Sequence, residues 1–263
     1  FVTLFALTGC SKDEKLEDVT IPSSQQDQSE EVEEIKNLPY TFPLTGIKTA
    51  EEPTSRPIAI TINNHPDARP QSGISKADIV YEMLVEGDAT RYLAIFQSNI
   101  PEKIGPVRSA RDYFIEIAKG LDSLYIAHGY SPEAHQMLNS GVVDHINGMQ
   151  YDGIYFNRSA NRKAPHNSYI TAENIALATQ KLNISLENEK NVAYTFYADE
   201  DSVKMGNKAK KIYMNYYSQN SSYSSIYEYD AESKKYFKSS PKANTMDELV
   251  DEQVAISNVL FFE

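Results

Sequence analysis

The segment Pro57-Ile58-Ala59-Ile60-Thr61-Ile62-Asn63 indicates how this chain folds. It contains a short apolar run without an internal proline, and Pro57 stands just before that run, where a missing N–H is tolerated. We predict a strand at 58–62 and at three similar runs, residues 79–85, 92–97 and 124–127. Because such runs alternate with helical segments from residue 56 to 183, the sequence predicts an α/β fold, a mixed sheet with flanking helices.

Three helix starts carry local capping signals. Ser109 precedes the acidic Asp112 by three residues, which is the spacing of a capping serine and an acidic residue in the first turn. Ser131 stands before Pro132, and proline is favoured at the first helical position. Thr171 precedes a third segment of periodic apolar residues. We therefore expect helices to begin after residues 109, 131 and 171.

The character of the chain changes after about residue 190. Nine of the 18 tyrosines fall between Tyr194 and Tyr236, and helix signals fade. Residues 225–229 and 235–237 flank a polar turn and predict an antiparallel hairpin, and the apolar residues 259–263 predict a further strand without a partner. We expect residues 39–188 to form the α/β domain and residues 189–263 a smaller β-rich domain that is incomplete at its C-terminus.

The first ten residues have the features of the end of a lipoprotein signal peptide. An apolar run leads into the lipobox Leu7-Thr8-Gly9-Cys10, and Cys10 is the only cysteine. We therefore expect residues 1–10 to be a signal remnant, with a lipid on Cys10 that holds the protein at the outer face of the cytoplasmic membrane. Residues 11–38 are rich in acidic, Ser and Gln residues and lack aromatic ones, which predicts a disordered acidic tether.

Charge and hydropathy argue against a nucleic-acid-binding protein and against a protein that spans the membrane. The net charge is −12 at pH 7 and no basic stripe is visible, so we expect no nucleic-acid partner. Beyond the signal remnant no apolar stretch approaches the roughly 20 residues that span a bilayer. Membrane association would therefore come from the lipid on Cys10.

Arginine and histidine are confined to one part of the chain. All seven arginines and all five histidines fall between residues 56 and 166. Since guanidinium groups suit bidentate recognition of carboxylate and phosphate, this favours an anion site in the α/β domain, and the alternative is ordinary surface ion pairs. In residues 105–112 a glycine turn feeds a helix start flanked by two arginines, and we expect Arg108, Ser109 and Arg111 to hold the anion there.

Acid/base groups stand near this segment. Asp112 could orient an arginine or take a proton, and His128 and Glu133 lie at a strand-to-helix junction, a usual place for sites in α/β folds. These three residues are the catalytic candidates, and the alternative gives them capping and structural roles. The histidines show no HExxH spacing, so we expect neither a metal nor a cofactor.

Two polar loops offer further ligand contacts. Residues 63–66 and 158–167 supply amide and imidazole groups of the kind that bind sugars or phosphates. From them we expect ligand contacts, with two ordinary surface loops as the alternative. The expected contact residues are Asn64, His65, His166 and Asn167.

Four separated segments resemble one family. Asn63-Asn64-His65-Pro66, residues 77–82, residues 104–113 and Lys163-Ala164-Pro165-His166-Asn167 are similar to the YerB-like lipoproteins of Gram-positive bacteria. The resemblance extends over roughly residues 40–263. It implies a lipobox-bearing protein of the cell surface with a larger N-terminal and a smaller C-terminal domain, and it carries over no catalytic residue.

A shorter match adds Arg91 to the expected anion contacts. Thr90-Arg91 followed by residues 108–112 resembles ligases that attach wall polymers to peptidoglycan from polyprenyl-pyrophosphate carriers. In that family an arginine-bearing strand and an arginine-aspartate segment hold the pyrophosphate. The rest of that family's pattern is missing from this chain.

Three functions follow as hypotheses. The first is a lipid-anchored binding or accessory module of the cell envelope that recognises an anionic wall component, a cell-wall polymer or its lipid-linked precursor. The second is an envelope enzyme acting on polyprenyl-pyrophosphate-linked or glycosidic wall precursors. The third is a structural partner of another envelope protein, paired through an open strand edge.

Overall fold

A computed structural model describes residues 37–190, 192–197, 206–217 and 220–262 of the 263-residue chain. The predicted lipobox at Cys10 and residues 11–36 of the predicted tether lie outside these residues. The chain divides between Leu38 and Pro39, and the unit from Pro39 onward is the one described below. Among the residues placed, no helix has both the length and the apolar character needed to cross a membrane.

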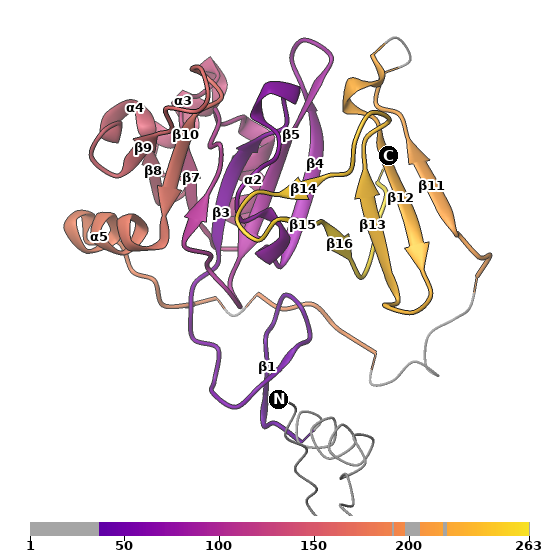
Figure 1. Cartoon of the computed structure of the whole chain (residues 1–263). Helices are drawn as coiled ribbons and strands as arrows, with labels where there is room; N and C mark the ends of the chain where they lie inside the picture. Colours follow the sequence, from indigo (N-terminus) through magenta and orange to yellow (C-terminus); the bar gives the residue numbers. More distant parts are fainter. Residues whose placement is uncertain (1–36, 191, 198–205, 218–219, 263) are drawn as a thin grey trace, which may run out of the picture. The chain divides into compact units, whose positions relative to one another are not determined.

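A five-stranded mixed sheet forms the centre of this unit (Figure 1). Its order is β4-β5-β3-β7-β8, with β3 antiparallel to β5 and parallel to β7. The strands are β3 (Ile58–Asn63), β4 (Ile79–Val85), β5 (Ala89–Phe96), β7 (Leu124–Ala127) and β8 (His145–Asn147). The four predicted strands are thus confirmed, and β5 begins three residues earlier than predicted because Ala89 pairs with Val85 across the hairpin.

Alternate residues of β3 are buried on opposite faces of the sheet, which is the period expected of a strand. Ile58, Ile60 and Ile62 pack on one face. This face is covered by α5 (Ala172–Leu182) and a small sheet of β6 (Lys103–Ile104), β10 (Ser168–Thr171) and β9 (Phe156–Arg158). Ala59 packs on the other face with residues of α2 (Asp112–Gly120) and α3 (Pro132–Asn139). The sheet is therefore covered on both faces, as an α/β layer structure requires.

Two of the three predicted helix caps are confirmed. The Ser131 hydroxyl accepts from the N–H of Ala134 at the start of α3, and the Thr171 hydroxyl accepts from the N–H of Asn174 at the start of α5. The prediction for Ser109 is wrong, because α2 begins at Asp112 after Arg111. Neighbouring Ala110 pairs with Tyr130 in an isolated parallel bridge, so this residue cannot belong to the first turn of the helix.

The elements of the C-terminal part form a second sheet of order β11-β12-β13-β16. Its strands are β11 (Lys211–Met214), β12 (Ser225–Asp230), β13 (Lys235–Ser239) and β16 (Ala255–Ile256). The predicted hairpin is β12 and β13. The strand predicted at 259–263 is wrong for residues 259–262, where no strand forms and Leu260 and Phe262 are exposed.

Shorter elements complete the fold. Residues after β3 form two 3₁₀ turns, and a third precedes β12. These elements are β1 (Tyr40–Thr41), β2 (Lys48–Thr49), η1 (Pro66–Ala68), η2 (Ile74–Lys76), α4 (Gly148–Tyr151), η4 (Ser221–Tyr223), β14 (Met246–Asp247) and β15 (Glu252–Gln253).

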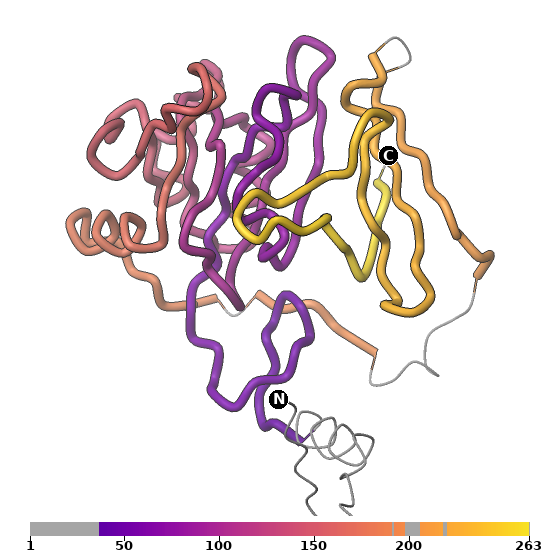
Figure 2. Tube along the Cα trace, viewed as in Figure 1, coloured from indigo at the N-terminus to yellow at the C-terminus, as the bar shows by residue number. Residues whose placement is uncertain are grey.

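Two buried carboxylates join the C-terminal part of the chain to the α/β part. Figure 2 shows the yellow C-terminal stretch returning to the indigo and purple part of the chain, and there the carboxylate of Asp247 accepts from the N–H groups of Gly73 and Ser75. Glu82 of β4 forms an ion pair with Lys238 of β13, with 2.9 Å between Oε2 and Nζ, and both side chains are less than a tenth exposed. The C-terminal sheet is therefore fixed against the edge of the central sheet.

Candidate functional site

A polar cleft of about 390 Å³ lies where the two sheets meet. The α/β part lines it from the end of β3, the β4–β5 hairpin, and the loops that carry Arg108 and His166. The C-terminal part contributes Asn220, Ser222 and Tyr223 at η4. The wall of the cleft thus comes from segments up to about 160 residues apart in sequence.

Arg91 enters the cleft from β5. The pairing of β3 with β5 sets it opposite Asn63, and one guanidinium nitrogen donates to the backbone carbonyl of Ser109 at 2.8 Å. Within the described residues it has no carboxylate at ion-pair distance. Burial, and then the charges of Arg111 and Arg108, lower its pKa to about 10.

Arg108 is held at its backbone and not at its side chain. Its N–H donates to Thr61 of β3, and its carbonyl accepts from His128 after β7. No hydrogen bond or ion pair of its guanidinium group is found in the part of the chain that the structure describes. Burial and the neighbouring charges of Arg111 and Arg158 lower its pKa. Arg108 is therefore a half-buried cation for which the described residues provide no counter-charge.

Arg111, in contrast, is neutralised. Its guanidinium group binds both oxygens of Glu86, with 2.7 Å between Nε and Oε1. The hydrogen bonds from Arg111 outweigh the effect of burial and hold the pKa of Glu86 at about 2. Ser109 turns its hydroxyl to the carbonyl of His128, while its own carbonyl receives Arg91. Of these expected anion contacts, Arg91 and Arg108 line the cleft, whereas Ser109 and Arg111 do not. Ser109 accepts a hydrogen bond from Arg91, and Arg111 binds Glu86, so both hold residues that line it.

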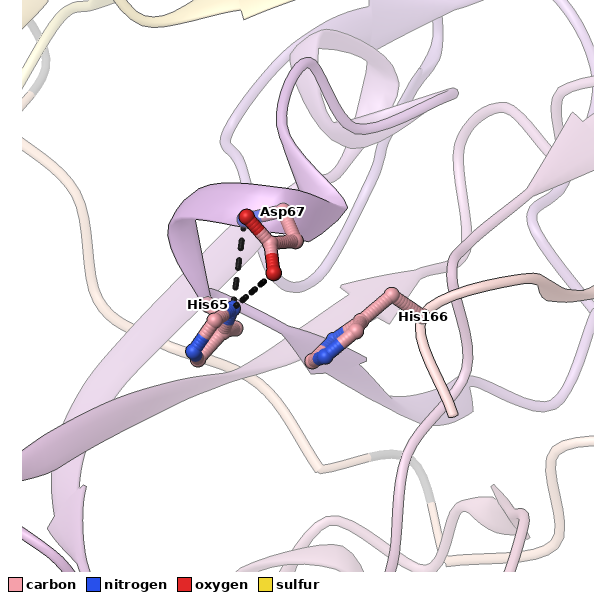
Figure 3. A group of neighbouring side chains, drawn as sticks. All are labelled: His65, Asp67 and His166. Carbon is pink, nitrogen blue, oxygen red and sulfur yellow. Dashed lines mark hydrogen bonds and ion pairs between the residues drawn. The ribbon is translucent and has the colours of Figure 1, made fainter. Parts of the chain in front are cut away.

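Two histidines stand beside the arginines. The rings of His65 and His166 stack with centroids 4.4 Å apart and an interplanar angle of 24° (Figure 3). Asn63, at the end of β3, contacts both residues: its side-chain oxygen accepts from the backbone N–H of His65, and its amide nitrogen lies 2.9 Å from Nδ1 of His166. Both histidines were expected as ligand contacts, and both line the cleft.

The expected contacts Asn64 and Asn167 are part of the framework. Asn64 is 2% exposed, donates to Glu82 and Thr90, and accepts from Arg69. Asn167 is buried, donates to a backbone carbonyl and accepts from Arg158. Neither lines the cleft.

None of the three catalytic candidates lines the cleft either. Asp112 sits in the first turn of α2, and Glu133 is exposed in the first turn of α3. His128 lies between the buried hydroxyl of Ser168, 2.7 Å from Nδ1, and the guanidinium group of Arg158, 3.0 Å from Nε2. Burial and then the charge of Arg158 lower the pKa of His128. Since Ser168 is 1% exposed, this hydroxyl–imidazole pair cannot reach a substrate.

One cluster has the residue types of a metal site. Donor atoms of His65, Asp67 and His166 lie within 4.8 Å of one another (Figure 3). However, Nδ1 of His65 accepts from the N–H of Asp67 at 3.2 Å, so this lone pair already caps η1. The sequence could not have shown this cluster by spacing, because His166 is about 100 residues from the other two.

The cleft also contains residues that sequence patterns missed. Glu86 lies in the turn between β4 and β5, and the turn residues Gly87 and Asp88 could have indicated a hairpin close to Arg91. Asn220, Ser222 and Tyr223 carried no signal, because only the packing of the second sheet brings them here.

Comparison with known proteins agrees with this architecture. Residues 44–185 match the family described as "Protein of unknown function (DUF3048) N-terminal domain". A relative named "Putative lipoprotein YerB" from Bacillus subtilis (strain 168) is 43% identical over 222 residues, which are 84% of this chain and 66% of that protein. The crystal structure of the YerB protein from Bacillus subtilis matches with a TM-score of 0.73 and 42% identity, covering 82% of this chain and 71% of that one. Sequence and fold together show that this chain belongs to the DUF3048 family of YerB-like proteins.

Proposed function

We propose that this protein is a lipid-anchored envelope protein whose cleft binds an anionic, phosphate-bearing or carboxylate-bearing component of the cell wall. One observation carries the proposal. Arg91 and Arg108 line a half-buried cleft without a carboxylate partner in the described chain, although the protein as a whole has a net charge of −12.

The electrostatics of the cleft favour an anionic ligand. Charges removed from water are stabilised by a counter-charge or by hydrogen bonds, and here the charges with the largest effect on the pKa of Arg91 and Arg108 are those of other arginines, although Glu86 partly offsets them at Arg91. An anion between them would remove this repulsion and accept charge-assisted, bidentate hydrogen bonds. The ligand would therefore supply the negative charge that the described residues do not provide for Arg91 and Arg108.

The proposed location rests on two observations. The lipobox ending at Cys10 provides an attachment point for a lipid, and the 43% identical relative carries the name of a lipoprotein. Anchoring through Cys10 would place the folded part at the outer face of the cytoplasmic membrane, where wall polymers and their lipid-linked precursors are present.

Calorimetric titration of the full chain with pyrophosphate-linked precursors and wall-polymer fragments tests the proposal. Arg108→Gln removes one charge-assisted contact, so we expect affinity to fall about tenfold or more. Lys211→Gln is the matched control, because it removes a positive charge from an exposed ion pair with Glu228 outside the cleft. Equal losses in both variants, or no binding by the wild type, would contradict the proposal.

An envelope enzyme is the second candidate function. It is favoured by the two imidazoles that line the same cleft as the arginines, in place of Asp112, Glu133 and His128. Turnover of a lipid-linked or glycosidic precursor that is lost in His166→Leu would support it. The structural-partner hypothesis was based on an open edge of the β-rich part; β11 is an edge strand of the C-terminal sheet, but no further observation points to a protein that pairs with it.

A further inference from the structure

We propose that His65 and His166 bind the ligand as neutral N–H donors, and that with Arg91 and Arg108 they select a phosphate group carrying two negative charges. This inference rests on the proposed function and names the ligand class of the same cleft. It also assigns the histidine cluster to anion binding and not to a metal.

The amide of Asn63 sets the tautomer of His166. Its side-chain oxygen accepts from the backbone N–H of His65, so the amide nitrogen is the group that faces Nδ1 of His166. A flipped amide would place two donors against each other at His65. Nδ1 of His166 therefore accepts, and the proton of the neutral ring is on Nε2.

His65 has the same tautomer for a different reason. Its Nδ1 accepts from the backbone N–H of Asp67 at 3.2 Å, whereas the carboxylate oxygen of Asp67 is 3.7 Å away and beyond hydrogen-bond distance, so the proton of the neutral ring is also on Nε2. Both rings line the cleft and lie stacked (Figure 3). The cleft thus gains two N–H donors that carry no charge.

The charges of the cleft predict the charge of the ligand. Glu86 is the acidic residue that lines it, and its carboxylate is bound by Arg111. Among the lining residues two guanidinium charges, those of Arg91 and Arg108, are left over; the carboxylate of Asp67 lies beside His65, but Asp67 does not line the cleft and its side chain is 74% exposed. A phosphomonoester, or a pyrophosphate bridging two groups, carries about two negative charges at neutral pH and offers several acceptor oxygens. A carboxylate would leave one guanidinium charge unbalanced.

The same hydrogen bonds argue against a metal ion at His65, Asp67 and His166. A metal needs an imidazole lone pair, and on each ring the Nδ1 lone pair already accepts a hydrogen bond. A cation there would also face the charge of Arg108, which, after burial and His65, lowers the pKa of His166. Ligand binding should therefore not require a metal.

Calorimetry on the full chain tests the inference with three probes: phenyl phosphate, inorganic pyrophosphate and glucuronate, each with and without EDTA. We expect the two phosphates to bind more tightly than glucuronate, and EDTA to have no effect. Zn²⁺ added alone should not bind stoichiometrically.

Variants of His166 separate the donor role from a metal-ligand role. His166→Leu removes the N–H and should weaken phosphate binding about tenfold, whereas His166→Gln places an amide N–H near the position of Nε2 and should restore most of the affinity. His135→Leu is the control, because His135 stacks on Tyr130 outside the cleft. Circular dichroism of each variant checks that it is folded.

The outcomes distinguish this inference from the proposed function. If Arg108→Gln abolishes phosphate binding but His166→Leu does not, the histidine role is wrong and the anion site stands. If EDTA abolishes binding, or Zn²⁺ binds and is lost equally in the Leu and Gln variants, the cluster is a metal site. Equal affinity for glucuronate overturns the selection for two charges, and no binding of any probe overturns both proposals.

Discussion

Replacing Lys238 with methionine should destabilise the protein by about 3–5 kcal/mol, because it leaves a buried carboxylate without a counter-charge. The side chains of Lys238 and Glu82 are 7% and 6% exposed. Burial, the largest single effect, lowers the pKa of Lys238, but the charge and hydrogen bond of Glu82 together with Tyr92 and Tyr227 outweigh it, and the pKa lies above the usual value for lysine. In the variant, Glu82 keeps the neutral donors Asn64, Thr90 and Ser225, which cannot balance its charge.

Urea denaturation followed by circular dichroism measures this loss. Lys211→Met is the matched control: Lys211 and Glu228 form an ion pair in which both side chains are 59% exposed, and its loss should cost about 0–1 kcal/mol. The double variant Glu82→Gln/Lys238→Met should regain at least half of the loss, since the amide keeps the neutral hydrogen bonds without a charge. A cost for Lys238→Met no larger than for Lys211→Met would refute the reasoning.

Three further predictions concern stability. Asp247→Asn sets an amide N–H against donors at the start of η2, and thermal denaturation should show a loss of about 1–3 kcal/mol; a shift within error would contradict this. In Gly148→Ala the new Cβ would lie 2.1 Å from Nδ1 of His128, so the same assay should show a loss of about 1–3 kcal/mol, with Gly120→Ala, which meets nothing within 4 Å, as the control. Burial lowers the pKa of three histidines below the value of about 6.5 in the unfolded chain, so acidification protonates the unfolded state first. These histidines are His128, His145 and His166. The free energy of unfolding should therefore decrease as the pH is lowered from 7.5 to 5.5, and a constant value in urea titrations over this range would count against the prediction.

The strands could be predicted because their signal is local. The run at β3 is buried on both faces, so nearly every residue is apolar, and β4 and β7 match their predicted bounds. The start of α2 could not be predicted, because Ser109 has a capping sequence but the next residue is drawn into a bridge with Tyr130. Long-range pairing overrides a local preference there.

Sequence patterns could predict the wall of the cleft that the α/β part forms, but not the wall formed by the C-terminal part. The confinement of arginine to the α/β part pointed to Arg91 and Arg108, and the polar loops pointed to His65 and His166. The catalytic candidates were selected from their position at helix starts and at a strand-to-helix junction, but none of the three lines the cleft. The opposite wall depends on contacts such as the one from Arg69 to the carbonyl of Ser222, 153 residues along the chain, which no local pattern encodes.

The Glu82–Lys238 ion pair has a consequence for how this family can be dissected. The segment that matches the family description ends at residue 185, and a fragment cut there would contain every arginine and histidine of the chain. It would lack Lys238, and Glu82 would lose the partner that balances its charge beside Asn64 and Thr90, the neighbours in sequence of His65 and Arg91. Such a fragment could fail to bind while carrying all the charged groups required, so a negative result obtained with it would say nothing about the intact protein.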